Sequence, residues 1–183
     1  MLSGLEEPAI AIPYELDHAF RAYHALVFRT AYRITGNAAD AEDVLQTIFL
    51  RLLRRDAKNP DSIQDPETYL RRAAINTALD VIRSRQAEQT VPLLEDGLGL
   101  PRTAPAQDRD YDLRRSLAGA IARLEPRPAE IFALRFLEGF SNRQIAEMLG
   151  ISQVLVAVIV HRTRRQLQNE LRPYLSVRTW QSD

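Results

Sequence analysis

Four polar side chains have the spacing needed to act together on one ligand. In a helix, intervals of four, four and three residues place them along one ridge, formed by Arg72, Asn76, Asp80 and Arg83. A guanidinium group can hold a phosphate, and Asn and Asp side chains carry donors and acceptors that can recognise an unpaired base. The same residues also suit a solvated helix face with one weak ion pair between Asp80 and Arg83. The ridge is therefore a candidate nucleic-acid site, with an ordinary exposed face as the alternative.

A second polar group precedes this ridge along the chain. It consists of Asp40, Glu42, Asp43 and Gln46. These side chains lie off the apolar stripe of their predicted helix, so we expect them to face outward. Acidic residues near a helix N-terminus are ordinary helix chemistry. An outward acidic face is also suited to docking a basic partner.

Residues 141–167 have the pattern of a helix-turn-helix motif. Ser141 and Gln144 predict a capping box, Gly150 predicts a left-handed turn, and Ser152 can cap the next helix. Ala146 is small where two helices must cross, and Val156 and Val160 are expected to face inward. The second helix of such a motif commonly enters the DNA major groove. A two-helix hairpin with a glycine turn that does not bind DNA is the alternative.

Candidate DNA contacts lie on and beyond this predicted second helix. They are Gln153, His161, Arg162, Arg164 and Arg165. Arginine side chains here could bind phosphates and position the helix without recognising sequence themselves. Alternatively, they form a solvated helix end, where cations are favoured by the helix dipole.

The elements that must position these groups are all predicted to be helices, in two small domains. Apolar residues recur at three- and four-residue spacing through residues 41–53, and a helix is expected to begin at Asp65-Pro66 after an earlier one over about residues 15–35. Prolines, glycines and acids then interrupt the pattern and predict a flexible linker. The expected divisions are a first domain, a linker, a second domain and a tail, over residues 1–86, 87–112, 113–175 and 176–183.

Composition narrows the functional classes. The formal net charge is zero, but residues 51–85 and 113–183 have an excess of basic residues, whereas residues 1–50 and 86–112 have an excess of acids. Two basic blocks suit two contacts with a polyanion, although solvated helix faces would give the same pattern. There is no cysteine, and His18, His24 and His161 lie in no motif with a nucleophile or metal spacing. We therefore predict neither an enzyme nor a metal or cofactor site.

No apolar run approaches the ~20 residues of a membrane span. The first 13 residues lack the basic start of a signal peptide. We therefore expect a cytoplasmic protein without membrane insertion.

The ordered set of motifs resembles the extracytoplasmic-function group of sigma factors in the sigma-70 family. The segment from Asp40 to Leu52 resembles the part of sigma region 2 that docks on the polymerase clamp, and the segment from Tyr69 to Arg83 resembles the helix that melts and recognises the minus-ten element. Segments between Leu124 and Ser152 resemble sigma region 4. The resemblance covers roughly residues 15–172 and includes the linker in place of region 3.

This resemblance implies a function in transcription initiation. Core RNA polymerase and promoter DNA are the implied partners, and an anti-sigma factor is a further candidate. The implied polymerase-binding residues are Asp40, Glu42, Asp43 and Gln46, and the implied minus-ten residues are Arg72, Asn76, Asp80 and Arg83. Region 4 would place its second helix in the major groove of the minus-thirty-five element.

The predicted recognition helix departs from the pattern of this family. Members usually have polar residues after Gly-Ile-Ser, whereas this chain has seven consecutive apolar residues from Val154 to Val160. We expect Val154, Ala157 and Val158 to face outward, where apolar groups can meet only thymine methyls. Two alternative functions therefore remain: a sigma-like decoy that binds an anti-sigma factor, and a plain helix-turn-helix regulator.

Overall fold

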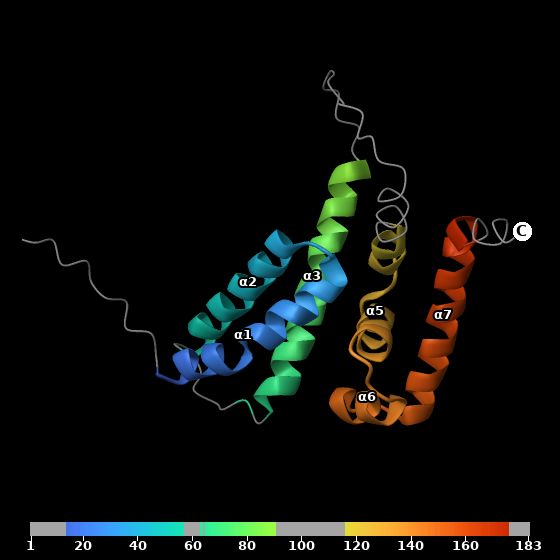
Figure 1. Ribbon diagram of the computed structural model, residues 1–183. Helices are drawn as coiled ribbons and strands as arrows, with labels where there is room; N and C mark the ends of the chain where they lie inside the picture. Colours follow the sequence, from blue (N-terminus) through green and yellow to red (C-terminus); the bar gives the residue numbers. More distant parts are fainter. Residues whose placement is uncertain (1–13, 57–62, 64, 91–115, 176–183) are drawn as a thin grey trace, which may run out of the picture.

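The computed structural model describes residues 14–56, 63, 65–90 and 116–175. All regular structure in these residues is helical, which confirms the predicted all-α class. Figure 1 shows two groups of helices side by side. Residues 116–122 form a helix, and the other elements are α1 (Tyr14–Thr35), α2 (Ala38–Asp56), α3 (Pro66–Thr90), α5 (Pro126–Phe132), the π-helix η1 (Ala133–Leu137), α6 (Asn142–Leu149) and α7 (Gln153–Leu175).

The first domain is a bundle of α1, α2 and α3, each packed against the other two. Gly36 ends α1 with a positive φ of 66°, a conformation that glycine adopts without steric cost. The side chain of Asn37 then caps α2 by accepting the backbone N–H of Asp40 at 3.2 Å. The tight turn between α1 and α2 lets their apolar faces meet, so Val27, Ala31 and Val44 are fully buried.

The second domain is formed by residues 116–175. Its first helix ends at residue 122, and α5 begins at Pro126, where a missing N–H costs nothing because the first helical position has no partner for it. Pro126 therefore starts a helix as well as marking a break. The helices α5 and α6 pack against α7, with Ile131, Leu134 and Ile145 fully buried.

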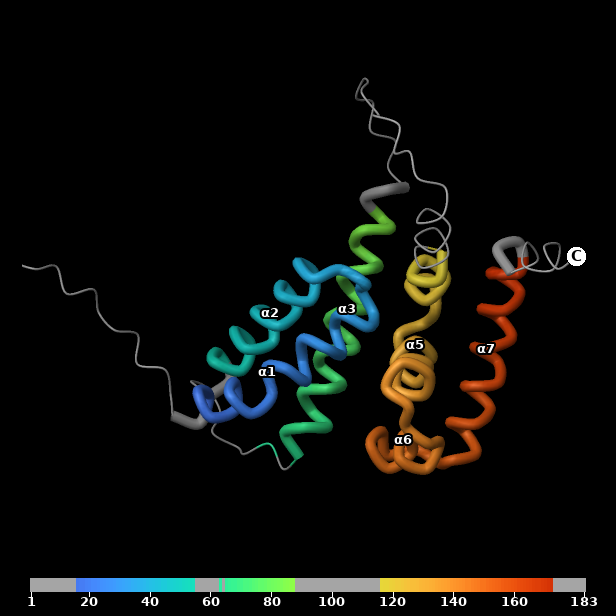
Figure 2. The backbone as a smooth tube through the Cα atoms, viewed as in Figure 1, coloured from blue at the N-terminus to red at the C-terminus, as the bar shows by residue number. Residues whose placement is uncertain are grey.

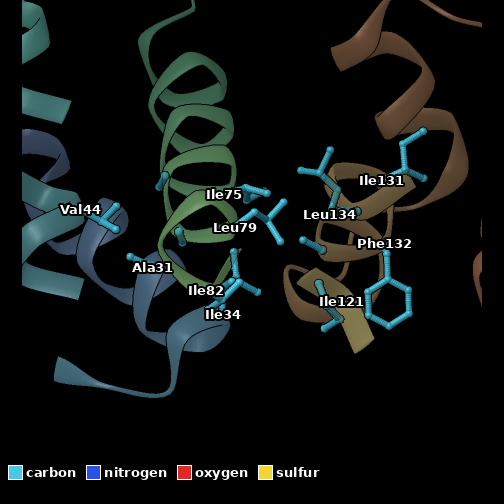
Figure 3. Close-up of a cluster of buried hydrophobic side chains, with 14 of the residues drawn as sticks. Ala31, Ile34, Val44, Ile75, Leu79, Ile82, Ile121, Ile131, Phe132 and Leu134 are labelled. Carbon is cyan, nitrogen blue, oxygen red and sulfur yellow. The ribbon is translucent and has the colours of Figure 1, made fainter. Parts of the chain in front are cut away.

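The longest helix, α3, differs from the prediction in two ways. It continues to Thr90, beyond the predicted domain end at residue 86, and the rest of the predicted linker falls outside the described residues. It is also buried on two sides. Leu70, Ala74 and Ala78 form one buried stripe at four-residue spacing, while Ile75 and Leu79 are buried as well. Figure 3 shows these last two side chains pointing from α3 toward the second domain, where Leu134 lies opposite.

The two domains pack against each other along α3. In the chain trace of Figure 2, α5 lies beside α3, and contacts join α3 to α5 and α1 to η1. The side of α3 that faces away from its own bundle is therefore partly covered by the second domain. This side carries the predicted polar ridge.

Candidate nucleic-acid interface

The ridge on α3 forms on a helix with a well-defined start. The side chain of Asp65 accepts the backbone N–H of Thr68 at 3.1 Å, and Pro66 follows the cap. Hydrogen bonding to Thr68 lowers the pKa of Asp65, so the cap is a carboxylate at neutral pH. The cap fixes where α3 begins, and the helical period then places side chains three and four residues apart on one face.

Two ridge residues contact one glutamate of the second domain. Nε of Arg72 donates to Oε1 of Glu130 at 2.8 Å, and Nδ2 of Asn76 donates to the same oxygen at 3.4 Å. The other oxygen, Oε2, accepts from Nη1 of Arg127 at 3.1 Å. The Glu130 side chain is only 5% exposed, so this network keeps a buried carboxylate paired.

The two remaining ridge residues, Arg83 and Asp80, differ in their contacts with the second domain. Arg83 donates through Nε to the carbonyl oxygen of Ala122 at 3.3 Å and through Nη2 to that of Leu124 at 3.2 Å. These carbonyls lie at the end of a helix, where backbone acceptors lack helical partners. Asp80 pairs with Arg83 at 3.1 Å, yet its side chain stays 70% exposed. Asp80, the one carboxylate of the ridge, is thus accessible to a ligand.

A second inter-domain cluster, which was not predicted from the sequence, lies beside the ridge. The carboxylate of Glu138 accepts from Nη1 of Arg33 at 3.0 Å and from Nη1 of Arg71, and its side chain is 1% exposed. Arg71 also lies over the ring of Phe140, with 5.2 Å from Cζ to the ring centroid. Glu138 lies 67 residues further along the chain than Arg71, so no local pattern indicates this pair.

The acidic group on α2 is only partly on the surface. Glu42, Asp43 and Gln46 are exposed as predicted. The predicted outward position of Asp40 is wrong: this residue is buried and forms an ion pair with Arg85 of α3. Burial raises the pKa of Asp40, while the positive charge of Arg85 opposes the shift. The side chain of Asp40 therefore ties α2 to α3.

The helix-turn-helix motif has the predicted local geometry. The Ser141 side chain and the Gln144 side chain form a reciprocal capping box at the start of α6. Gly150 has φ 62° at its end, and Ser152 Oγ accepts the N–H of Leu155 at 3.2 Å to cap α7. The chain direction turns by 113° between α6 and α7, within the range for helix-turn-helix motifs. Val156 is fully buried in the angle between them.

Two family models match the chain, one over each domain. Sigma-70 region 2 matches residues 19–88, and Sigma-70, region 4 matches residues 114–167. The chain is 32% identical over 163 residues to RNA polymerase sigma factor CarQ of Myxococcus xanthus, covering 85% of this chain and 92% of that protein. This chain belongs to the extracytoplasmic-function group of sigma-70 factors.

Two other members of this group are longer. The chain is 33% identical over 168 residues to the ECF RNA polymerase sigma factor SigE of Mycolicibacterium smegmatis, covering 87% of this chain and 63% of the relative. Against the probable ECF RNA polymerase sigma factor SigI of Mycobacterium tuberculosis it is 31% identical over 166 residues, covering 87% of this chain and 56% of the relative. In the terms of the family, the first domain contains region 2 and the second contains region 4.

The outward face of α7 in region 4 is apolar, as the sequence predicts. Val154 is 73% exposed, and Leu155, Ala157 and Val158 are exposed as well. Among the N-terminal residues of α7, only Gln153 offers an exposed side-chain amide. The predicted inward position of Val156 is confirmed, while Val160 is partly buried against the core. This face offers little for hydrogen bonding to base edges.

The basic residues further along α7 are available to a ligand. His161, Arg162, Arg164 and Arg165 are all exposed. None of them has a hydrogen-bond or ion-pair partner within the described part of the chain. Region 4 therefore has free positive charge beside an apolar surface, whereas Arg71, Arg72 and Arg83 on α3 are paired.

The described ranges contain no group of three or more side chains suited to hold a metal ion. Within the same ranges, no single helix is long and apolar enough to span a membrane, and only the sharply bent pair of α6 and α7 meets that test by length and composition.

Proposed function

We propose that this sigma factor binds core RNA polymerase and directs it to promoters, with α3 capturing the separated minus-ten strand. The observation that carries this proposal is the ridge of Arg72, Asn76, Asp80 and Arg83 along one side of a capped helix in region 2. The arginines suit phosphates, and the Asn and Asp side chains suit the edges of unstacked bases. These residues match the minus-ten positions that the family resemblance implies.

The exposed acidic face of α2 supports polymerase docking. Glu42, Asp43 and Gln46 are free for a basic partner, and they match the clamp-binding segment of the family. Asp40 is not part of this proposed face because its carboxylate is buried against Arg85. Its contribution to docking is to hold α2 in place.

For region 4 we propose DNA contacts mainly with phosphates. Arg162, Arg164 and Arg165 suit this role, with His161 and Gln153 as further contacts. The apolar face of α7 leaves sequence choice mainly to region 2. Since core polymerase and promoter DNA are the proposed partners, the protein would act in the cytoplasm as a regulatory subunit.

Reconstituted transcription tests this function. Core polymerase would be supplied with a promoter library, with and without the protein, and transcripts would be sequenced. We expect a defined subset of promoters to become active only when the protein is present. If the folded protein binds core polymerase but activates no promoter above the level of core polymerase alone, the proposal is wrong.

A second candidate is a decoy that sequesters an anti-sigma factor and does not start transcription. The observation that favours it is the exposed apolar surface of Val154, Leu155 and Val158, which suits a protein partner better than DNA. A decoy would activate no promoter in the same assay, yet would relieve inhibition of another sigma factor by its anti-sigma factor. A plain helix-turn-helix regulator is not needed to explain a chain that contains both sigma regions.

A further inference from the structure

Two stripes of exposed side chains lie on the outward faces of α2 and α7. Side chains three and four residues apart share one face of a helix. The stripe on α2, called the α2 stripe below, consists of Asp43, Gln46, Leu50 and Arg54. The stripe on α7, called the α7 stripe, consists of Val154, Val158, Arg162 and Arg165. Each stripe combines apolar and charged side chains that are open to a partner.

The apolar side chains of both stripes are accessible to solvent. Leu50 is 51% exposed, Val154 is 73% exposed and Val158 is 39% exposed. Polar and charged residues lie next to them on the same helix faces. An exposed apolar surface with a polar rim is typical of a site that contacts another protein. We therefore looked for a protein surface that matches both the apolar and the charged parts.

The charged ends of the two stripes are opposite in sign and unpaired. Within the described ranges, none of Asp43, Arg162 and Arg165 has a hydrogen-bond or ion-pair partner. The carboxylate lies toward the N-terminal end of α2, and the two arginines lie beyond the valines toward the C-terminal part of α7. Opposite charges on two surfaces both attract the surfaces and fix their register.

The spacing of the two stripes matches when the helices run antiparallel. Asp43 precedes Leu50 by seven residues, and Arg165 follows Val158 by seven residues. At a rise of 1.5 Å per residue, both intervals are about 10.5 Å along the helix axis. A contact that places Leu50 on Val158 therefore also places Asp43 beside Arg165.

The other two positions fit the same register. Gln46 comes opposite Arg162, and its side-chain oxygen can accept a hydrogen bond from the guanidinium group. Arg54 comes opposite Val154, and its aliphatic stem can cover the valine while the charged group stays in water. Every position of the α2 stripe thus has a suitable neighbour on the α7 stripe.

The two stripes of one molecule lie too far apart to meet. Figure 1 shows α2 and α7 on opposite flanks of the molecule, with α3 and α5 between them. Contacts join α2 to α3, α3 to α5, and α5 to α7 in turn. The matching stripe is instead available on a second copy of the chain.

From this complementarity we infer that the protein associates with itself head to tail, with the α2 stripe of one copy against the α7 stripe of the next. The partner of each stripe is a second copy of this chain. Because the two stripes differ, the contact is heterologous, and a dimer keeps one free stripe of each kind. A single pair of helices is a small contact, so the association is transient and depends on protein concentration.

Self-association would cover surfaces that the proposed function uses. Asp43 and Gln46 belong to the proposed polymerase-docking face, and Arg162 and Arg165 are proposed phosphate contacts. A copy in such a complex would lose one of these surfaces, so surplus factor would be held in a form that cannot start transcription. This consequence rests on the proposed function, whereas the contact between copies does not.

A charge swap between the two stripes is the most direct test. Asp43→Arg and Arg165→Glu each place like charges opposite one another, and the double variant restores an opposite pair. Both side chains are exposed, so we expect the variants to fold. Sedimentation velocity of the full-length protein, over about a hundredfold range of concentration, measures the Kd of self-association.

We expect the wild-type protein to sediment faster as its concentration rises. Each single variant should raise the Kd by at least about tenfold, because like charges then face each other. The double variant should return to within about threefold of the wild-type Kd, because the attraction between the stripes is restored.

The matched control for the double variant is Asp43→Arg with Arg164→Glu. It has the same net charge, but residue 164 lies about 100° around α7 from residue 165 and therefore off the stripe. This control should associate as weakly as Asp43→Arg alone. A wild-type protein that stays monomeric throughout, or a charge swap that recovers no more affinity than the control, would overturn the inference.

Cross-linking covers the case in which a charge variant does not fold. The chain has no cysteine, so Gln46→Cys and Arg162→Cys each introduce a single thiol, and the register places these positions opposite each other. A short bismaleimide should link an equimolar mixture of the two variants into dimers. Arg164→Cys replaces Arg162→Cys in the control, because residues two apart lie on nearly opposite sides of a helix. Equal linking in the two mixtures would contradict the proposed contact.

These outcomes are separable from failure of the proposed function. If the wild-type protein activates promoters but stays monomeric at every concentration, the function stands and self-association is wrong. If the charge swap restores association but the wild-type protein activates no promoter with core polymerase, self-association stands and the proposed function is wrong.

Discussion

The ridge on α3 and the apolar face of α7 differ in their chemistry and in their accessibility to a ligand. The face of α3 carries three of the side chains best able to hold phosphates and bases, but Arg72, Asn76 and Arg83 all contact region 4. The face of α7 is exposed, yet Val154 and Val158 can make only apolar contacts with DNA. DNA recognition needs both suitable donors and access to them. In this conformation neither face provides the two together.

This difference suggests an unequal division of labour between the regions. Under the proposed function, region 2 would select sequence through α3 and would need a conformational change to do so. Region 4 would need no such change, but its exposed arginines would contact phosphates, which carry no direct sequence information. The predictions below test the two regions in turn, beginning with polymerase docking, on which both DNA-binding faces depend.

The largest effect is expected at the polymerase-docking face. Glu42→Lys combined with Asp43→Lys should abolish co-purification with core polymerase, because two exposed carboxylates become cations that repel a basic partner. Helicity should be retained, since neither side chain is buried. Glu147→Lys, an exposed charge reversal in region 4, is the control and should still bind. Full binding by a folded double variant would exclude this face.

The next effect concerns the arginines of the α3 ridge. Arg72→Ala or Arg83→Ala should lower transcription from all promoters by similar factors of about tenfold, because phosphate contacts are independent of sequence. Each loss should also reduce the salt dependence of open-complex binding by about one counterion. A change restricted to some promoters would contradict a phosphate role.

A smaller and more selective effect is expected from the two residues between those arginines. Asn76→Ala and Asp80→Ala should change which minus-ten sequences are used, with losses of about 1–3 kcal/mol at preferred sites and little at others. Promoter-library transcription measures this directly. Asp80 is the cleaner test, because its side chain is largely exposed and its ion pair is with Arg83 of the same helix. Uniform losses from both variants would argue against base recognition.

Local features were predictable from sequence wherever both partners lie within a few residues. The caps at Asp65 and Ser141 and the left-handed turn at Gly150 were all found this way. Each depends on the short-range chemistry of one side chain and the adjacent backbone. These caps indicated where the corresponding helices begin.

Contacts between distant parts of the chain were not predictable in this way. Asp40 has the spacing of a surface residue, but its partner is Arg85, on another helix. Glu130 and Glu138 meet arginines more than 50 residues away, and no local pattern indicates such pairs. One signal was present: Ile75 and Leu79 lie on the supposedly polar side of α3, and apolar residues on two sides of a helix indicate two packing partners.

The smallest effect is expected at α7, where open access is combined with poor chemistry for base recognition. A good bidentate contact to a base contributes about 1–3 kcal/mol of discrimination, and Val154, Ala157 and Val158 can make none. Scrambling the minus-thirty-five element should therefore change transcription by less than about threefold, under roughly 0.7 kcal/mol. Val154→Lys with Val158→Arg should leave region 4 folded, since both side chains are exposed. Val156→Lys is the matched control on the same helix: its side chain is fully buried, and an unpaired buried cation should unfold region 4. Thermal unfolding followed by circular dichroism distinguishes the two variants. A loss above about tenfold on scrambling, some 1.4 kcal/mol, would mean that α7 does select sequence. The apolar face would then act through thymine methyl groups, and the division of labour between the two regions would have to be abandoned.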